Sequence, residues 1–244
     1  RMKRIIITNN PLLKPLYGNL NKNKFTFSVL SEIACVEAIN KNEFDLALIS
    51  PLIYASINSK EDIKILPTKM LVLEDFTKTV AINIRQNKES LSKIFFHTSN
   101  EFIIVATKLV LCERFNIVPE LTNNLEEADI IVNYGDRIEN CLEVNLSEDW
   151  YDTFEVPLVM GFWVFKDDED YNSENYKDII ELVSSFANSN LESKKDHSED
   201  YQRYGKEYWE WKKDFLDALE KIFDVLYYYG YAHNIVDAKL LSNE

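Results

Sequence analysis

Small polar residues stand directly before the start of a predicted helix at three places in the sequence. These are Asn9-Asn10 before Pro11, Ser50 before Pro51, and Thr98-Ser99-Asn100 before Glu101. Residues of these types cap helix N-termini, where unpaired backbone N–H groups and the positive end of the helix dipole favour an anion. Proline suits the first helical position, because an N–H has no helical partner there. The sequence therefore predicts turns that could hold a carboxylate or a phosphate.

Any one of these turns, taken alone, is more often structural than functional, since most capped helices bind nothing. In open parallel sheets, however, such turns gather at the carboxyl edge, where ligands usually bind. We therefore predict a cleft for a small anionic, carboxylate-bearing ligand. Its predicted lining residues are Asn9, Asn10, Ser50, Thr98, Ser99 and Asn100.

The other reactive side chains form no convincing constellation. His97, His197 and His233 lie far apart and show no metal-ligand spacing to each other or to cysteines. With only 5 glycines and no phosphate-binding glycine motif, the sequence predicts neither a nucleotide nor another cofactor. Asp136, in "NYGD", could act as a general acid or base, or could simply close a turn.

Short apolar runs alternate with helical patterns, which is typical of an α/β protein with a largely parallel sheet. Strands are predicted at residues 4–8, 25–30, 44–50, 78–85, 93–98, 128–136 and 157–166. Helices are predicted at 11–20, 32–40, from 51 onward, at 100–115, 173–189 and 199–229, with a polar connector between the last two. Because the pattern begins again after residue 85, we predict two lobes: residues 1–85 with 167–244, and an inserted lobe of residues 86–166.

Composition excludes several classes of partner. The formal net charge of −14 argues against nucleic acid and anionic membrane surfaces, which attract basic proteins. No stretch approaches the roughly 18 apolar residues of a membrane-spanning helix, and the apolar run Ile5–Ile7 is too short for a signal peptide. The 3 cysteines lack paired spacing and are expected to be reduced thiols. We therefore expect a cytoplasmic protein of undetermined oligomeric state.

Five segments, in order, resemble the chorismate dehydratase family of the futalosine route of menaquinone biosynthesis. "RIIITNNPLLKPL" (4–16) is similar to R-I-G-x-V-S-Y-L-N-T-R-P-L, and "FDLALISPLIYA" (44–55) is similar to D-V-A-L-V-S-S-I-E-Y. "FFHTSNEFIIVATKLVL" (95–111) resembles a strand followed by T-S-x-T-S at a helix start. "ADIIVNYGD" (128–136) resembles A-L-L-I-G-D, and residues 144–165 resemble D-L-G-x-x-W followed by G-L-P-F-V-F-A-V-W.

The resemblance implies a type 2 periplasmic-binding-protein fold, in which two α/β lobes are joined by crossing strands and the ligand lies between them. It also implies a cofactor-independent lyase that removes water from chorismate to give 3-enolpyruvylbenzoate. Such a reaction requires proton removal from carbon and donors for two carboxylates. By this resemblance the strand-end residues named above would supply the donors, and Asp136 would carry the proton.

The sequence departs from the family pattern at positions that matter for this reaction. Apolar residues replace family polar residues at Leu12, Pro51, Ile53 and Phe102, and Glu101 would repel a carboxylate bound at its helix. Three hypotheses therefore stay open. They are a lyase acting on chorismate or a close relative, a divergent non-catalytic carboxylate-binding protein of the same fold, and a solute-binding protein of a transporter, which normally carries an export signal.

Overall fold

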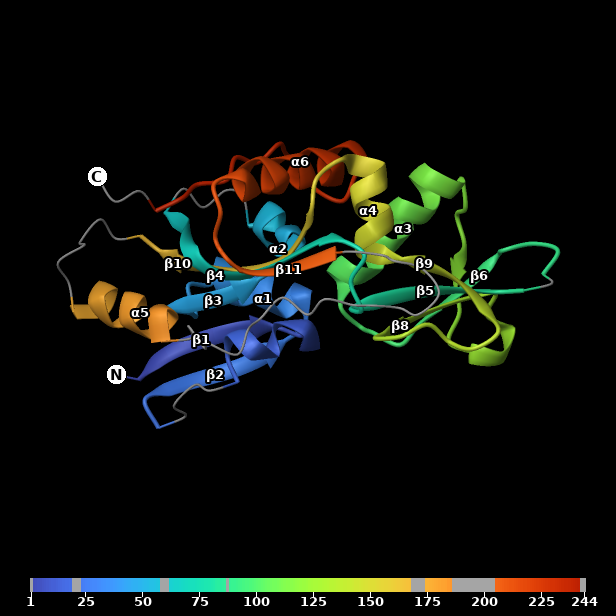
Figure 1. The fold of residues 1–244 in the computed structure, drawn as a ribbon. Helices are drawn as coiled ribbons and strands as arrows, with labels where there is room; N and C mark the ends of the chain where they lie inside the picture. The colour runs from blue at the N-terminus through green and yellow to red at the C-terminus, as the bar shows by residue number, and fades with distance from the viewer. Residues whose placement is uncertain are drawn as a thin grey trace. The chain divides into compact units, whose positions relative to one another are not determined.

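The computed structural model describes residues 2–18, 23–57, 62–86, 88–167, 174–185 and 205–241. The chain divides into two compact units. The first runs to Val72 and resumes at Val159 and again at Tyr208, whereas the second is built on Leu73–Leu158. Each unit contains its own β-sheet, coloured along the chain in Figure 1.

The first unit is organised around a six-stranded sheet of order β11-β4-β10-β3-β1-β2. Its strands are β1 (Lys3–Thr8), β2 (Phe25–Leu30), β3 (Leu46–Ile49), β4 (Ile63–Asp75), β10 (Leu158–Lys166) and β11 (Gly205–Glu210). Strand β1 pairs in parallel with both β2 and β3, and β10 runs antiparallel to β3. The carboxyl ends of β1, β2 and β3 therefore meet at one edge of this sheet.

Helices cover the first sheet and close its core. They are the short 3₁₀ helix η1 (Pro11–Leu16), α1 (Glu32–Asn40), α2 (Pro51–Ser56), α5 (Glu174–Ser185) and α6 (Asp214–Tyr228). The ring of Tyr54 in α2 stacks on Phe223 of α6 at a centroid distance of 5.2 Å and meets the edge of Phe162 of β10 at 5.9 Å. These aromatic contacts join α2, α6 and the sheet into one apolar core, and α6 lies over α2 in Figure 1.

The second unit has a five-stranded sheet of order β7-β6-β8-β5-β9. Its elements are β5 (Val80–Arg85), β6 (Lys93–Phe96), α3 (Glu101–Phe115), β7 (Glu120–Leu121), η2 (Leu125–Glu127), β8 (Ile130–Tyr134), β9 (Cys141–Asn145) and α4 (Leu146–Phe154). Strand β6 is parallel to β8, and β5 is antiparallel to both β8 and β9. The ends of β6, β8 and β9 and the start of β5 therefore share one edge, which we call the carboxyl edge of the second sheet.

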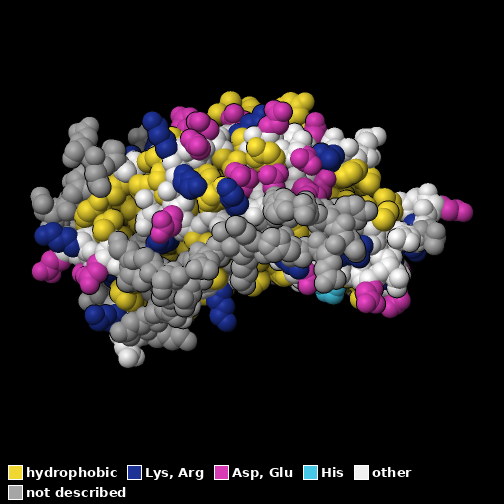
Figure 2. All heavy atoms as spheres, in the orientation of Figure 1, with side chains coloured by type: hydrophobic (Ala, Val, Ile, Leu, Met, Phe, Trp, Pro, Cys, Tyr) yellow, Lys and Arg dark blue, Asp and Glu magenta, His cyan; other side chains and the backbone are white. Residues whose placement is uncertain are grey.

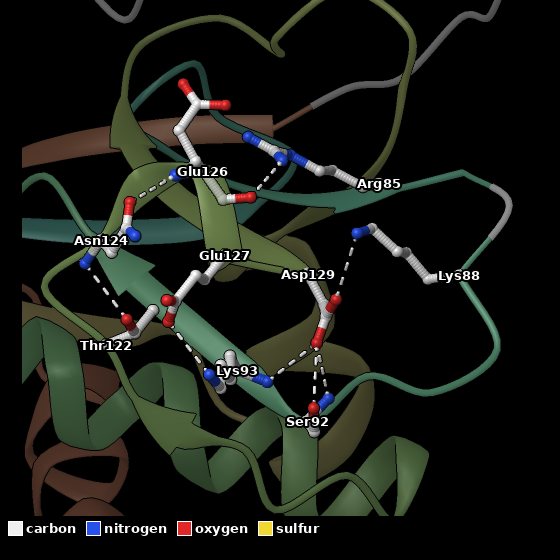
Figure 3. A network of polar contacts seen from close by, with 9 residues as sticks. All are labelled: Arg85, Lys88, Ser92, Lys93, Thr122, Asn124, Glu126, Glu127 and Asp129. Carbon is white, nitrogen blue, oxygen red and sulfur yellow. Dashed lines mark hydrogen bonds and ion pairs between the residues drawn. The ribbon is translucent and has the colours of Figure 1, made fainter.

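A polar network around Asp129 fixes the opposite edge of the second sheet (Figure 3). One carboxylate oxygen of Asp129 accepts hydrogen bonds from the backbone N–H groups of Ser92 at 2.9 Å and Lys93 at 3.0 Å, and the other lies 3.7 Å from the Lys88 ammonium. Burial would raise the pKa of Asp129, but these hydrogen bonds and the charge of Lys88 outweigh it and hold the pKa below its ordinary value. The network thus joins the start of β6 to the start of β8.

The surface carries charges of both signs. Lysine and arginine side chains are interspersed with aspartate and glutamate over the face shown in Figure 2. Within the described ranges, no helix combines the length and the apolar character needed to cross a bilayer.

Several predicted elements need correction. Residues 199–229 were expected to be helical, but Gly205–Glu210 form the edge strand β11, and α6 begins only at Asp214. Pairing with β4 explains the difference: Glu210 forms an ion pair with Lys69, and the Trp211 N–H donates to Thr68 O at 2.9 Å. The expected helix 11–20 is a 3₁₀ helix that ends at Leu16, and the expected connector between 190 and 198 lies outside the described residues.

The predicted lobe boundaries also differ from the observed units. Residues 78–85 were assigned to the first lobe, but β5 lies in the second sheet between β8 and β9. Residues 157–166 were assigned to the inserted lobe, but β10 pairs with β3 in the first sheet. The sheets are also mixed rather than largely parallel, because β10 and β5 run antiparallel to neighbours.

Candidate functional site

A buried carboxylate lies at the carboxyl edge of the first sheet. Glu32, the first residue of α1, is only 2% exposed. The hydroxyl of Thr8, at the end of β1, donates to Glu32 Oε2 at 2.5 Å. The hydroxyl of Ser50, which follows β3, donates to Glu32 Oε1 at 2.7 Å. We call Thr8, Glu32 and Ser50 the Glu32 cluster; it joins two strand ends to the start of α1.

Two of the predicted ligand donors in this unit act as helix caps. Asn10 Oδ1 accepts the Leu12 N–H at 3.0 Å, and Ser50 Oγ accepts the Ile53 N–H at 3.3 Å. Both capping residues are buried, whereas Asn9 is half-buried and its backbone N–H donates to Leu30 O at 2.8 Å. The prediction of N-caps at these positions is therefore confirmed, and much of the hydrogen-bonding capacity of these side chains is used within the protein.

Hydroxyl groups also meet at the carboxyl edge of the second sheet. Thr98 Oγ1, just after β6, lies 2.6 Å from the phenol oxygen of Tyr134 at the end of β8. Burial raises the pKa of Tyr134, although its hydrogen bond with Thr98 acts in the opposite direction. Ser99 is exposed beside this pair, and the buried Asn100 caps α3 by accepting the Ile103 N–H at 3.0 Å.

Charged residues stand at the same edge. Asp136 follows β8 and lies 3.6 Å from the ammonium of Lys78, which precedes β5. The Asp136 side chain is 78% exposed, so this carboxylate differs from the desolvated carboxylates common in active sites. Glu101, at the first position of α3, is half-buried, and this burial raises its pKa. The edge therefore carries the Lys78–Asp136 ion pair and the half-buried Glu101, in addition to the hydroxyl groups described above.

Two asparagine side chains, the buried Asn83 and the half-buried Asn133, hold the turn that carries Asp136. Asn83, in β5, donates to Ile131 O of β8 at 2.9 Å and accepts the Ile138 N–H at 2.7 Å. Asn133 donates to the backbone carbonyl of Asp136 at 3.0 Å. The position of residues 134–138 is thus set by side chains of two neighbouring strands.

The structure groups the predicted residues within each unit. Asn9, Asn10 and Ser50 follow neighbouring strands of the first sheet, while Thr98, Ser99, Asn100 and Asp136 share the carboxyl edge of the second sheet. The prediction that both groups line one cleft stays a prediction. No group of potential metal ligands occurs within the described residues.

Sequence reasoning missed four polar residues of these edges. They are Thr8, Glu32, Lys78 and Tyr134. Thr8 ends the predicted strand 4–8, and Tyr134 lies near the end of the predicted strand 128–136. Lys78 begins the predicted strand 78–85, and Glu32 follows the capping serine of α1. A search of all polar residues near strand ends and in first helical turns would therefore have included them. The apolar replacements have a plain structural role, because Pro51, Ile53 and Phe102 are buried and Leu12 is half-buried.

Sequence comparison identifies no relative. No protein-family model matches the chain, and no curated protein is detectably similar to it in sequence.

Comparison with solved structures does give matches over nearly the whole chain. An ABC transporter protein from Parabacteroides distasonis has a TM-score of 0.58 at 12% identity, covering 100% of this chain and 99% of its own. Protein AF1704 from Archaeoglobus fulgidus has a TM-score of 0.56 at 13% identity, with coverage of 94% and 98%. The periplasmic aliphatic sulphonate binding protein SsuA from Escherichia coli has a TM-score of 0.52 at 12% identity, with coverage of 100% and 94%.

The chain has a periplasmic-binding-protein-like fold. The fold class predicted from the sequence is therefore confirmed, as two α/β units with mixed sheets. At 12% to 13% identity the similarity establishes the fold and leaves function to the residues of the site.

Proposed function

We propose that this protein binds a small molecule through an anionic group at the carboxyl edge of the second sheet. The observation that carries the proposal is the meeting of Thr98 and Tyr134 hydroxyls beside the exposed Ser99 at the start of α3. Ligands of open α/β sheets usually bind at this edge. The fold is shared with a sulphonate-binding protein over the whole chain, which supports a small ligand.

An anionic group suits this edge for two reasons. The first turn of the long helix α3 directs its dipole toward residues 98–100, and an anion is stabilised at that end. Lys78 adds a positive charge at the same edge, where it lies 3.6 Å from Asp136, the residue that follows β8 by two positions. The half-buried Glu101 opposes both effects, so we expect modest affinity.

The proposal is tested by thermal unfolding in the presence of methanesulfonate and benzoate, because specific binding raises the unfolding temperature by mass action. Ser99→Ala and Lys78→Gln are each expected to weaken binding of the effective anion by about threefold to thirtyfold, as for lost hydrogen bonds to a charged partner. Lys108→Gln, farther along α3, makes the same charge change and should leave affinity unaltered. Equal affinities in all variants would contradict the assignment.

A second candidate function is dehydration of chorismate, in line with the family resemblance. The placement of Asp136 at the same sheet edge as Thr98 favours it, because a proton acceptor and a hydrogen-bond donor would then lie near one ligand. Two features instead favour binding without turnover. The Asp136 side chain is exposed, and apolar residues stand at Leu12, Pro51 and Phe102, where the family pattern has polar residues. Incubation of the protein with chorismate, with Asp136→Asn as the control, separates the two: formation of enolpyruvylbenzoate that requires Asp136 would establish the lyase.

A further inference from the structure

The segment that follows α6 returns to the start of β4 and pairs with it (Figure 1). The backbone N–H of Ile65 donates to Lys239 O at 2.8 Å, and the Leu241 N–H donates to Ile65 O at 2.9 Å. These hydrogen bonds make a parallel bridge between Ile65 and Leu240. Residues 236–241, which we call the C-terminal strap, therefore lie against β4 in the manner of an added strand.

A side chain of the first unit also holds the backbone of the strap. The hydroxyl of Tyr54, in α2, donates to Asp237 O at 3.3 Å and accepts the Lys239 N–H at 3.1 Å. Burial raises the pKa of Tyr54, although the hydrogen bond from Lys239 acts in the opposite direction, so the phenol keeps the proton that it donates. Tyr54 and Ile65 thus recognise the main chain of the strap through four hydrogen bonds, and such recognition requires no particular side chains.

Two side chains of the strap are buried and add specificity. Val236 and Leu241 are 9% and 7% exposed, whereas Ile235, directly before the strap, is 67% exposed. Extended peptides are commonly recognised in this way, with main-chain hydrogen bonds that give affinity and selected side chains that give specificity. The contacts of the strap are therefore those of a bound peptide with aliphatic residues at positions 236 and 241.

The surface under the strap is fixed by other parts of the first unit. The Tyr54 ring stacks on Phe223 and meets the edge of Phe162, and Ile65 belongs to β4, which lies beside β10 in the sheet. The strap is held less firmly, because residues 237–240 are half-buried or exposed and the preceding residues 233–235 are exposed. A segment with few buried apolar side chains opens at a lower free energy than the core.

We propose that Tyr54 and Ile65 form a binding site for an extended segment of a partner protein, and that the C-terminal strap occupies and blocks this site. A partner segment with aliphatic residues at the positions of Val236 and Leu241 would replace the strap and make the same main-chain hydrogen bonds. This site lies in the first unit and does not depend on the anion binding proposed for the second sheet, so each proposal can fail without the other.

The test measures binding of a fluorescein-labelled peptide of residues 235–241 to the full-length protein by fluorescence anisotropy. In Leu241→Asp the strap is expected to detach, because a carboxylate replaces a buried leucine. This variant should bind the peptide at least about tenfold more tightly than wild type, in which the tethered strap competes at a high effective concentration. Adding Tyr54→Phe keeps the stacked ring but removes both hydrogen bonds of the hydroxyl, so it should weaken peptide binding to Leu241→Asp about tenfold.

Ile235→Asp is the matched control, because it makes the same kind of change at an exposed position beside the strap. It should bind the peptide as weakly as wild type. Equal affinities of wild type and Leu241→Asp, or equal affinities of Leu241→Asp with and without Tyr54→Phe, would overturn the inference.

If Leu241→Asp does not fold, amide hydrogen exchange of the wild-type protein decides. The amides of Lys239 and Leu241 should exchange by local opening, at least about tenfold faster than the amides of β3 after correction for intrinsic rates. Exchange as slow as that of β3 would show that the strap opens only when the whole unit unfolds, and would overturn the inference.

Discussion

The side chain of Leu13 occupies the space beside Gly161. Both Cδ atoms of Leu13 lie 2.7 Å from the position that a β-carbon on Gly161 would take. Leu13 is fully buried in η1, and Gly161 lies in the middle of β10. The leucines after Asn10 therefore have a packing role, since Leu13 anchors the turn that presents Asn10 at the sheet edge.

Gly161→Ala is expected to destabilise the protein by about 1–3 kcal/mol, because the added methyl group overpacks a filled core. Urea unfolding at equilibrium measures the change. In a Leu13→Ala background, which opens a cavity, the same glycine substitution should cost much less, because residues in contact are not additive. If the changes in the free energy of unfolding caused by Gly161→Ala and Leu13→Ala simply add, Leu13 does not pack against Gly161 as described.

Ser50→Ala should lower the free energy of unfolding by about 1–3 kcal/mol, because it removes a helix cap and one of the donors to the buried Glu32. The control is Ser56→Ala in the same helix, where the exposed hydroxyl donates to Leu52 O at 2.8 Å. That substitution should change stability by less than about 0.5 kcal/mol. Similar losses for the two variants would argue against the Glu32 cluster as a structural unit.

Asp129 gives the stability a predictable pH dependence. Its pKa in the folded protein is held below the ordinary value of about 3.9, so its ionised form stabilises the fold above that pH. This contribution is lost as the pH falls through the lower pKa of the folded state. Asp129→Asn should therefore be less stable than wild type at pH 7, with a difference that shrinks toward pH 3.

Unfolding temperatures across this pH range measure the effect. Glu126→Gln is the control, because the Glu126 carboxylate points away from the network in Figure 3. It should follow the wild-type curve. A difference between Asp129→Asn and wild type that stays constant from pH 7 to pH 3 would contradict the assignment.

The cysteines differ in access to solvent. Cys35 and Cys141 are buried, whereas Cys112 is only partly buried. A thiol reagent such as dithionitrobenzoate should therefore react quickly with one thiol of the native protein and with all 3 after denaturation. Cys112→Ser should abolish the rapid phase, and rapid labelling that persists in this variant would place the accessible thiol elsewhere.

Local sequence patterns predicted most elements of the fold and failed where pairing decides structure. Apolar runs ending in capping residues gave β1, β3 and α3 within about two residues, because strand burial and helix capping are local effects. The edge strand β11 was predicted as helix, because its aromatic residues can pack in a helix or in a strand. Only pairing with β4 makes this segment a strand. Lobe boundaries were misplaced for the same reason, because β5 and β10 are assigned to their sheets by distant partners.

At the candidate site, the sequence predicted the helix caps but not the hydrogen-bond partners of their side chains. Capping residues marked the strand ends correctly, yet the direction of a hydroxyl proton depends on a partner distant in sequence. Ser50 was expected to donate to a ligand, but Glu32, 18 residues away, accepts that proton. Tyr134 and Lys78 were missed because neither belongs to a residue type that marks helix starts.

Asn83 has a consequence for folding as well as for the turn near Asp136. Its amide sits opposite Ile131 in the antiparallel pair of β5 with β8, and the two strands are otherwise rich in interchangeable aliphatic residues. A slip of β5 by one residue would turn this amide to the other face and leave it without its backbone partners. The single buried amide of Asn83 therefore favours the native register of β5 with β8, because a shifted register would be less stable.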